Sequence, residues 1–292
     1  MKTRILLGAV LIAILCGLFY LDWAHQRYVT TSTEPTRLDK IPQGAVMAAV
    51  LVLVILLGLR EMRGLSAAVG IRTLRSSALV STLALALLPL AMKEGTLSST
   101  LRVENLVLGV ALGLVFFEQM IFRGVDDALR SVAATVLAIL YLGVGTAMML
   151  MIRLDHGLMA FLLFLAAVKC TDIGAYFAGT AAGRHKMAPR ISPGKSWEGL
   201  AGGLAAAAGV SMLLAHVLAM PLTLPQAAVF GVIVGLAGQF ADLCESALKR
   251  AAGVKDSGHV LPQFGGVLDM LDSLLLSAPA AWLVLHLMTA PK

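Results

Sequence analysis

The chain reads VAATVLAILYLGVGTAMMLMI over residues 132–152 and GLMAFLLFLAAVKCTDIGAYFAG over residues 157–179, two apolar runs separated by four residues. A transmembrane helix needs roughly 20 consecutive, mostly apolar residues. Each run is long enough to cross a bilayer, and the charged Arg153 and Asp155 between them predict a turn at a membrane surface. The pair therefore predicts a polytopic membrane protein.

The composition of the whole chain agrees with these two runs. Of its 292 residues, 59% are hydrophobic and 14% are charged, and the mean hydropathy is +0.87. A water-soluble domain is about 45–50% apolar and about 25% charged. The three cysteines follow neither a disulfide framework nor a metal-binding spacing. These values exclude a soluble globule, a disordered chain and a disulfide scaffold, and the predicted fold class is an all-α membrane protein.

Nine apolar runs are expected to cross the membrane. We expect the first five to form an N-terminal scaffold over residues 1–152. The other four are expected to form a catalytic region over residues 153–292, with cytoplasmic loops at 180–198 and 249–268. The first run is expected to be an uncleaved anchor because no small-residue cleavage pattern follows it. The runs cover residues 5–20, 44–59, 78–92, 106–122, 132–152, 157–179, 199–220, 225–241 and 273–289.

The distribution of Lys and Arg predicts the orientation. With nine spans and a cytoplasmic N-terminus, fifteen of the 23 basic residues fall on the inner face and seven on the outer face, while Lys169 lies within a span. Cytoplasmic loops of membrane proteins retain an excess of Lys and Arg. The net charge of +6 is therefore a sign of topology, and it does not indicate a nucleic-acid surface.

Polar side chains gather where the eighth run ends and the ninth begins. Carboxylates at membrane depth are costly, at ~2.5–3.5 kcal/mol for a central Asp, and need a partner, a cavity or a metal. Mg²⁺ binds carboxylate and phosphate oxygens, and lysines neutralise further phosphate charge, so this group favours phosphoryl or nucleotidyl transfer. The alternative is that the charges merely end helices in ion pairs. The group comprises Asp242, Glu245, Ser246, Lys249, Lys255, Asp269 and Asp272.

A second polar stretch reads GRHKMAPRISPGKSWEG over residues 183–199. It contains Gly-Lys-Ser, but a P-loop needs a glycine where Pro189 stands and must follow a strand, so we reject that motif. A basic inner loop suits phosphate or lipid headgroups, although it could also serve topology alone. Just before it, Lys169 and Asp172 lie one helical turn apart. They either neutralise each other or place Asp172 on an active cavity, and we favour the cavity.

These two stretches together resemble the phosphatidate cytidylyltransferases, also called CDP-diacylglycerol synthases. The C-terminal match runs through SALKRAAGVKDSG at 246–258, Leu-Pro at 261–262, Gly-Gly at 265–266 and LDMLD at 268–272. The block from residue 169 to residue 199 resembles a second motif of the family. The specific resemblance covers about the last two-fifths of the chain, whereas the earlier spans agree only in number and hydrophobicity.

The resemblance implies a reaction of CTP with phosphatidate that gives CDP-diacylglycerol and pyrophosphate. It implies Mg²⁺, leaves open a second, monovalent or divalent cation, and places a homodimer in the inner membrane with its active site on the cytoplasmic face. Metal and CTP phosphates would be held by Asp242, Asp269 and Asp272. Ser246, Lys249, Lys255 and Asp256 would line the phosphate and lipid-headgroup site, and further substrate contacts would come from Asp172, Arg184, Lys186, Ser192, Lys195, Glu198 and Arg250.

Two positions depart from the family pattern. Phe264 stands where the family usually has His, and Met270 stands where it usually has Arg. Neither change removes a predicted metal ligand, so we expect activity to survive with altered lipid specificity. Two other functions stay open: a CTP-dependent lipid alcohol kinase, and a transporter in which Lys169, Asp172 and Asp242 form an ion or substrate path.

Overall fold

The fold is almost entirely helical in the computed structural model, which describes residues 13, 17–25, 27–28, 41–93, 103–258 and 265–290. A single two-stranded antiparallel sheet is present in this described part of the chain. The elements are α2 (Ala45–Ala68), α3 (Arg75–Lys93), α4 (Val103–Arg123), α5 (Ala128–Ala138), the π-helical turn η3 (Ile139–Val144), α6 (Gly145–Ala182), β1 (Lys186–Ala188), β2 (Ser192–Ser196), α7 (Trp197–Val217), α8 (Leu224–Ala251) and α9 (Val267–Thr289).

Seven helical stretches in the described ranges are long and apolar enough to span a membrane. One of them, Ala128–Ala182, joins α5, η3 and α6 into 55 residues, more than twice the length that one crossing needs. The chain is therefore an all-α integral membrane protein. Most of the predicted first span lies outside the described residues, although residues 17–25 are helical.

The helix is broken between the two opening runs, although residues 153–156, where the sequence predicts the turn, still belong to the first helix. The break comes at Gly157, whose φ of 85° is outside the helical region. The polar side chains of the connection have partners in other helices. Arg153 Nε lies 2.5 Å from Asp22 Oδ2, and Trp282 Nε1 donates to Asp155 Oδ2 at 2.9 Å. The predicted division at residue 152 thus falls inside α6, just before its break.

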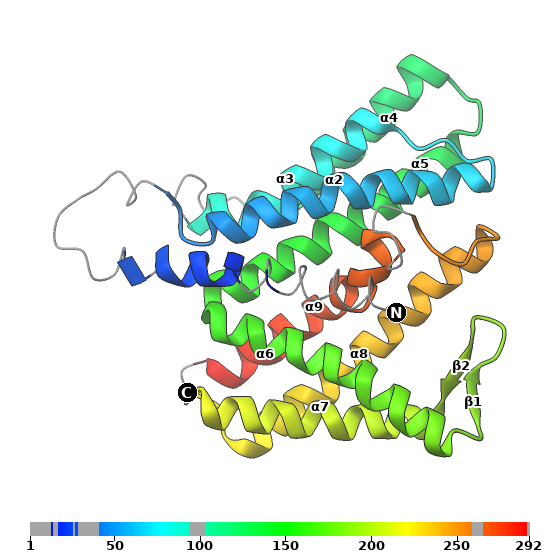
Figure 1. Cartoon of the computed structure of the whole chain (residues 1–292). Coiled ribbons are helices and arrows are strands. Elements are labelled where there is room, and N and C mark those ends of the chain that lie inside the picture. Colours follow the sequence, from blue (N-terminus) through cyan, green and yellow to red (C-terminus); the bar gives the residue numbers. More distant parts are fainter. Residues whose placement is uncertain are drawn as a thin grey trace.

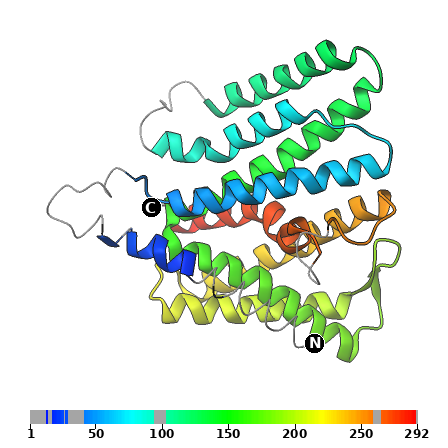
Figure 2. The same ribbon diagram turned by 45° about the horizontal axis from the view of Figure 1, so that its top comes forward.

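The helices form two groups that meet along α6 and α9. Figures 1 and 2 show α2 to α5 on one side of these two helices and α7 and α8 on the other. Small residues let α6 and α7 approach closely, as expected from the glycines and alanines of the seventh run. A Cβ on Gly174 would lie 2.6 Å from Ala206 Cβ, and one on Gly203 would lie 2.7 Å from the Thr171 carbonyl oxygen. Close packing of small residues is a common way for membrane helices to associate.

A β-hairpin replaces most of the predicted loop at 180–198. It pairs Lys186 with Ser196 and Ala188 with Ser192, and in Figure 1 it projects beyond the helices at the same end as the last turns of α8. Ser196 ends the hairpin and caps α7, because its hydroxyl accepts a hydrogen bond from Gly199 N at 3.1 Å. The hairpin thereby fixes the predicted basic residues against the start of a spanning helix.

Candidate active site

A cavity of about 610 Å³ lies between α6, the hairpin, α7 and α8. It collects polar residues that are far apart in the sequence. Five of the predicted site residues line it, and they come from four different elements. They are Asp172, Lys186, Ser192, Lys195 and Asp242.

Lys195 is the cavity lysine that contacts an aspartate. Its Nζ lies 2.7 Å from Asp242 Oδ2 and donates to the Gln239 carbonyl oxygen at 3.2 Å. The other Asp242 oxygen, Oδ1, accepts a hydrogen bond from Ser246 at 3.2 Å. The hairpin thus places Lys195 in direct contact with the Asp242 carboxylate of α8.

Asp172 belongs to the same cavity and is weakly paired. Gln239 Nε2 donates to Asp172 Oδ1 at 3.0 Å, while Lys169 Nζ stands 3.9 Å from Asp172 Oδ2. The sequence left two interpretations, an ion pair of Lys169 with Asp172 or an Asp172 that lines a cavity, and each describes part of the geometry. The ion pair is at the limit of contact, and the carboxylate faces the cavity.

The two aspartates of α9 have different surroundings. Asp269 is saturated, because it accepts hydrogen bonds from Lys249 Nζ at 2.7 Å, Gly266 N at 2.7 Å, and Ser257 N and Oγ at 2.9 and 3.0 Å. Asp272 lies one turn further along, is 9% exposed, and interacts electrostatically with Asp242 and Asp172. The three predicted metal ligands therefore have two kinds of surroundings. Asp242 and Asp272 interact electrostatically with each other, whereas Asp269 is paired with Lys249.

The sequence analysis missed Glu61, a buried residue of the N-terminal scaffold. Its carboxylate accepts hydrogen bonds from Val267 N and Leu268 N, both at 2.8 Å, and from Ser257 Oγ at 3.1 Å. It thus binds the first backbone N–H groups of α9. A Cβ on Gly266 would lie 2.5 Å from Glu61 Oε2 and one on Gly258 would lie 2.8 Å from Oε1, so Glu61 explains why these motif positions are glycine.

Glu245 is a second buried acid that received no role. It lies 1% exposed and its Oε2 is 2.5 Å from Lys249 Nζ. Lys249 therefore sits between Glu245 and Asp269. Glu245 was part of the predicted polar group, and the same signal was available for Glu61, since an ionisable residue within a spanning helix indicates a partner or a function.

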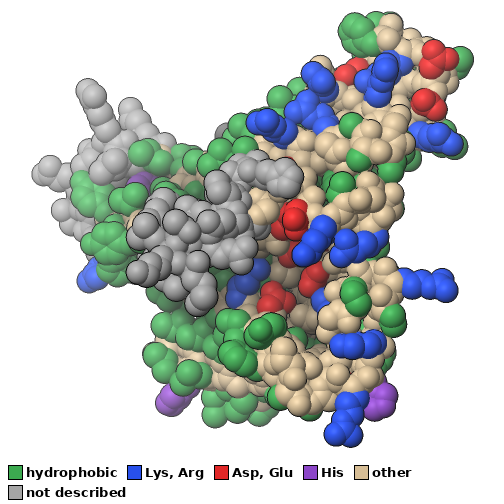
Figure 3. All heavy atoms as spheres, turned by 45° about the vertical axis from the view of Figure 1, so that its right-hand side comes forward, with side chains coloured by type: hydrophobic (Ala, Val, Ile, Leu, Met, Phe, Trp, Pro, Cys, Tyr) green, Lys and Arg blue, Asp and Glu red, His purple; other side chains and the backbone are tan. Residues whose placement is uncertain are grey.

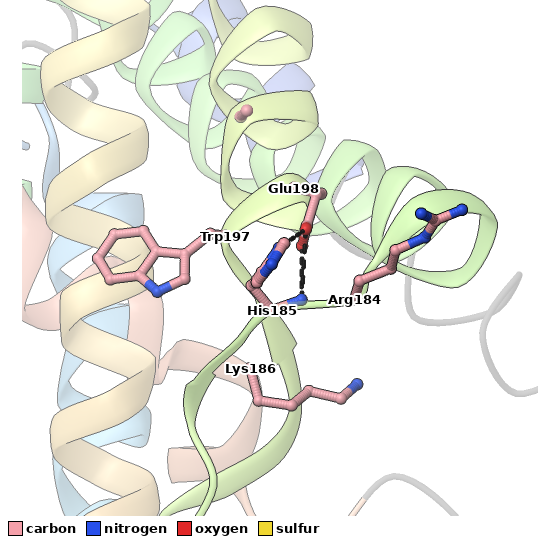
Figure 4. A pocket seen from close by; sticks show the side chains of 6 residues that line it. Arg184, His185, Lys186, Trp197 and Glu198 are labelled. Atoms are coloured by element: carbon pink, nitrogen blue, oxygen red, sulfur yellow. Dashed lines mark hydrogen bonds and ion pairs between the residues drawn. The ribbon is translucent and has the colours of Figure 1, made fainter.

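The remaining predicted residues lie around the hairpin and the loop after α8. Glu198 is held by His185, whose backbone N donates to it and whose Nδ1 is 2.5 Å from Oε1; Figure 4 shows this pair beside Arg184, Lys186 and Trp197. Those five residues border an open depression of about 810 Å³. Arg250 Nε donates to the Ile191 carbonyl oxygen at 3.3 Å and ties α8 to the hairpin.

Lys255 and Asp256 are exposed in the loop after α8, and neither lines the cavity. Phe264, the first departure from the family pattern, lies outside the described residues. Figure 3 shows acidic and basic side chains gathered in the middle of one face of the molecule, flanked by hydrophobic ones. On this face the acidic side chains at the centre lie directly beside basic ones, while further charged side chains stand at its upper right.

The carboxylates around the cavity could supply oxygen ligands to Mg²⁺. Within the described ranges, no group of three or more His, Cys, Asp or Glu side chains is placed to hold a metal ion. Mg²⁺ usually takes only one or two carboxylates and completes its octahedron with water and substrate phosphates. Asp242 fits this mode because it lines the cavity, and Asp272 is close enough to interact with it electrostatically. Asp269 fits it poorly, because four donors already occupy its oxygens.

Comparison with known proteins connects this geometry to a family. The sequence model of a family described as the cytidylyltransferase family matches residues 40–288. This range contains all the predicted site residues and every labelled helix except the last residue of α9. The match therefore extends over the spans where the sequence alone had shown agreement only in number and hydrophobicity.

Individual relatives are similar over shorter stretches. A phosphatidate cytidylyltransferase of Staphylococcus saprophyticus is 31% identical over 209 residues, which is 72% of this chain and 79% of the relative. One from Brucella suis is 40% identical over 147 residues, 49% of this chain and 53% of the relative. An uncharacterized Escherichia coli protein, YnbB, is 41% identical over 127 residues, 44% and 42% of the two chains. The chain thus spans about half the length of the last two.

Proposed function

The chain belongs to the cytidylyltransferase family, and from this premise we propose that it is a phosphatidate cytidylyltransferase. It would transfer CMP from CTP to phosphatidate and release pyrophosphate, a step in phospholipid biosynthesis. The observation that carries the proposal is the cavity in which Lys195 meets Asp242 beside Asp172. This arrangement at one end of a membrane-embedded bundle suits the joining of a water-soluble phosphate compound to a lipid phosphate.

The reaction is an in-line displacement at the α-phosphorus of CTP. A phosphate oxygen of phosphatidate forms the new O–P bond, the bond between the α-phosphorus and its bridging oxygen to the β-phosphorus breaks, and pyrophosphate leaves with that electron pair. Phosphatidate is already a competent nucleophile, so no covalent enzyme intermediate is needed. Because two anions must approach, catalysis consists chiefly of positioning and charge neutralisation.

The chain's own residues divide these tasks. Lys195 and Lys186 from the hairpin would bind CTP phosphates, and Ser192 would donate to them from the same cavity. Lys195 would exchange its contact with Asp242 for a phosphate oxygen when CTP enters. Lys169 stands on the other side of Asp172 and would bind the phosphate of phosphatidate.

Mg²⁺, where bound, would neutralise the phosphate charge and orient the leaving group. We propose that Asp242 and Asp272 hold it, since Asp242 lines the cavity, would lose its contact with Lys195 when CTP enters, and interacts electrostatically with Asp272. The prediction that Asp269 is also a ligand requires it to release Lys249 and the backbone of the loop. A second, monovalent or divalent cation would bind in addition to the Mg²⁺ held by Asp242 and Asp272.

The topology completes the proposal. Nine crossings with a cytoplasmic N-terminus would put the hairpin and the cavity on the cytoplasmic face of the inner membrane, as the basic residues of the hairpin favour. Alkaline phosphatase fused after Thr289 should be active in a bacterial host and inactive when fused after Arg184. The reverse pattern would invert the topology. The proposed homodimer should appear as a doubled mass in detergent.

The decisive assay identifies the lipid product. Purified protein is incubated with phosphatidate, Mg²⁺ and each labelled nucleoside triphosphate in turn. We expect only CTP to give a lipid that carries CMP, together with one pyrophosphate per lipid formed. Release of CDP with a newly phosphorylated lipid alcohol would establish the kinase instead, and solute flux in proteoliposomes without CTP would support a transporter.

A further inference from the structure

An apolar pocket of about 440 Å³ lies between α2, α6, α9 and the helical residues 17–25. Its walls are almost entirely hydrocarbon, with side chains such as Val54, Leu57, Leu165 and Leu274. A protein interior tolerates few voids larger than a water molecule, and an apolar cavity of this kind offers water too few partners. The pocket is therefore suited to binding an apolar group.

Charged groups stand at only two places in the lining of this pocket. Lys169 lies on the second half of α6 and Arg153 on its first half. The break at Gly157 lies between them, and the twelve residues of helix from that break to Lys169 span roughly 18 Å. The pocket is thus a long apolar slot with a cation near each end, and its length is comparable to that of a membrane acyl chain.

The Lys169 end connects the pocket to the candidate active site. Lys169 Nζ donates to the Met270 carbonyl oxygen at 3.0 Å and lies 3.3 Å from Ser273 Oγ. It is 3.9 Å from Asp172 Oδ2, and Asp172 lines the polar cavity. Its side chain is 44% exposed, so its ammonium group can receive a phosphate that enters between the two spaces.

The Arg153 end is closed. Arg153 and Asp22 form an ion pair whose side chains are each 3% exposed. A buried pair of this kind is held in place, because separating its members leaves an uncompensated charge in an apolar region. The far end of the slot therefore cannot open easily to admit a longer chain.

Met270 lies at the end of the apolar pocket nearest Lys169. Its side chain lines the apolar pocket one residue after Asp269, at the position where the resemblance leads us to expect an arginine. Methionine is flexible and fits irregular apolar spaces. The substitution thus removes a charge from the end of the slot nearest Lys169 and extends its apolar wall.

We propose that this pocket holds one acyl chain of phosphatidate. Lys169 binds the lipid phosphate at one end, and the Arg153–Asp22 pair limits chain length at the other. The inference rests on the proposed function and adds to it a binding site for the lipid tail and the residues that set chain-length preference.

Chain-length selectivity tests the proposal. Val54→Trp should fill the slot, whereas Val80→Trp makes the same exchange on α3 at a side chain that is 55% exposed and outside the pocket. We measure kcat/KM for CDP-diacylglycerol formation from dipalmitoyl and dihexanoyl phosphatidate. Burial of one methylene is worth about fourfold in an equilibrium constant, so Val54→Trp should lower the long-to-short ratio at least about tenfold. Val80→Trp should leave it unchanged.

An unchanged ratio in Val54→Trp would overturn the proposal. Activity on the short lipid shows that the variant is folded. If Val54→Trp loses activity on both lipids, Leu165→Ala decides, because enlarging the slot should raise the long-to-short ratio. A ratio that stays the same or falls in Leu165→Ala would also overturn the proposal.

Photo-crosslinking separates this inference from the proposed function. Phosphatidate with a diazirine in one acyl chain should label peptides of α2 and α9 in the full-length wild-type protein, even if no CMP-bearing lipid is formed. Labelling confined to the exposed face of α4, or equal labelling by a phosphatidylglycerol probe, would show ordinary bilayer contact and would overturn the proposal.

Discussion

Two polar regions lie side by side at the ends of α8 and α9, and they use similar residues differently. The first, here called the clamp, comprises Glu61, Lys249, Ser257 and Asp269, and its carboxylates are filled by protein donors. The second, here called the cavity group, comprises Asp172, Lys195 and Asp242, which line the cavity, and Asp272, which interacts electrostatically with both other aspartates. The clamp fixes the loop and the start of α9, while the cavity group is left for substrate and metal.

Asp269 and Asp272 show the division most clearly, because they stand one turn apart on one helix and belong to different regions. Spacing alone cannot separate them. What separates them is the loop before α9, whose Ser257 and Gly266 N–H groups donate to Asp269, whereas Asp272 accepts from Ser273 N of its own helix. A motif can therefore contain both a structural and a chemical aspartate.

Asp242→Asn should give the largest effect. It removes the negative charge that faces both Lys195 and the proposed cation, and we expect kcat to fall about 10²–10³-fold, as for loss of one electrostatic contact in a preorganised site. Steady-state formation of labelled CDP-diacylglycerol measures it. The matched control is Asp126→Asn, an exposed aspartate in the turn after α4, which should retain full activity. A near-normal kcat in Asp242→Asn would show that the Asp242 carboxylate takes no part in the proposed reaction.

Glu61→Ala should weaken the clamp. It leaves two buried backbone N–H groups and the Ser257 hydroxyl without their acceptor, so the free energy of unfolding should fall by about 2–4 kcal/mol. Thermal unfolding in detergent gives the comparison. Glu118 accepts hydrogen bonds from Ser76 N and Ser77 N at the start of α3, so Glu118→Ala removes a similar cap at a more exposed site. If both variants lose equal stability, the clamp has no special role.

Lys195→Met should raise the KM for CTP roughly tenfold, about the value of one charge-assisted hydrogen bond to a phosphate. The KM for phosphatidate should change less, because Lys169 is assigned to that phosphate. Lys93→Met provides a control at the other end of the molecule, where Lys93 Nζ binds the Leu154 carbonyl oxygen. Equal changes in both KM values would show that Lys195 does not distinguish the two substrates.

Met270→Arg should have the smallest effect. It introduces the residue usual in the family at the rim of the apolar slot, and a partly exposed charge is worth only ~0.2–1 kcal/mol. We expect the preference for long acyl chains to fall by about two- to fivefold, measured as the ratio of kcat/KM values. Met270→Leu should keep the original preference, and an increase in Met270→Arg would contradict the assignment.

The apolar helices could be predicted from the sequence because hydrophobic length is a local property. Residues 78–92 and 273–289 fall inside observed helices, and so does the run 44–59 apart from Gly44, which caps α2. The hairpin could not be predicted in the same way. Its strands contain Pro193 and Gly194 and lack an alternating pattern, and they pair because the hairpin closes over the ends of α6 and α7.

The candidate site could be predicted from the sequence only in part, for a similar reason. Asp242 and Lys195 stand out as charges beside apolar runs, and the structure brings them to 2.7 Å. Glu61 stands between Arg60 and Arg63 and looks like part of a charged helix end. Its partners are about 200 residues away along the chain, so only the tertiary structure reveals its contact with the motif.

The most direct test of the division between clamp and cavity group is a Mg²⁺ titration of CDP-diacylglycerol formation in Asp272→Asn and Asp269→Asn, with the melting temperature of each measured in parallel. The account predicts that Asp272→Asn raises the Mg²⁺ concentration for half-maximal activity while keeping the wild-type melting temperature, and that Asp269→Asn lowers the melting temperature with the Mg²⁺ requirement of its folded fraction unchanged. A raised Mg²⁺ requirement in Asp269→Asn, with wild-type stability, would contradict it.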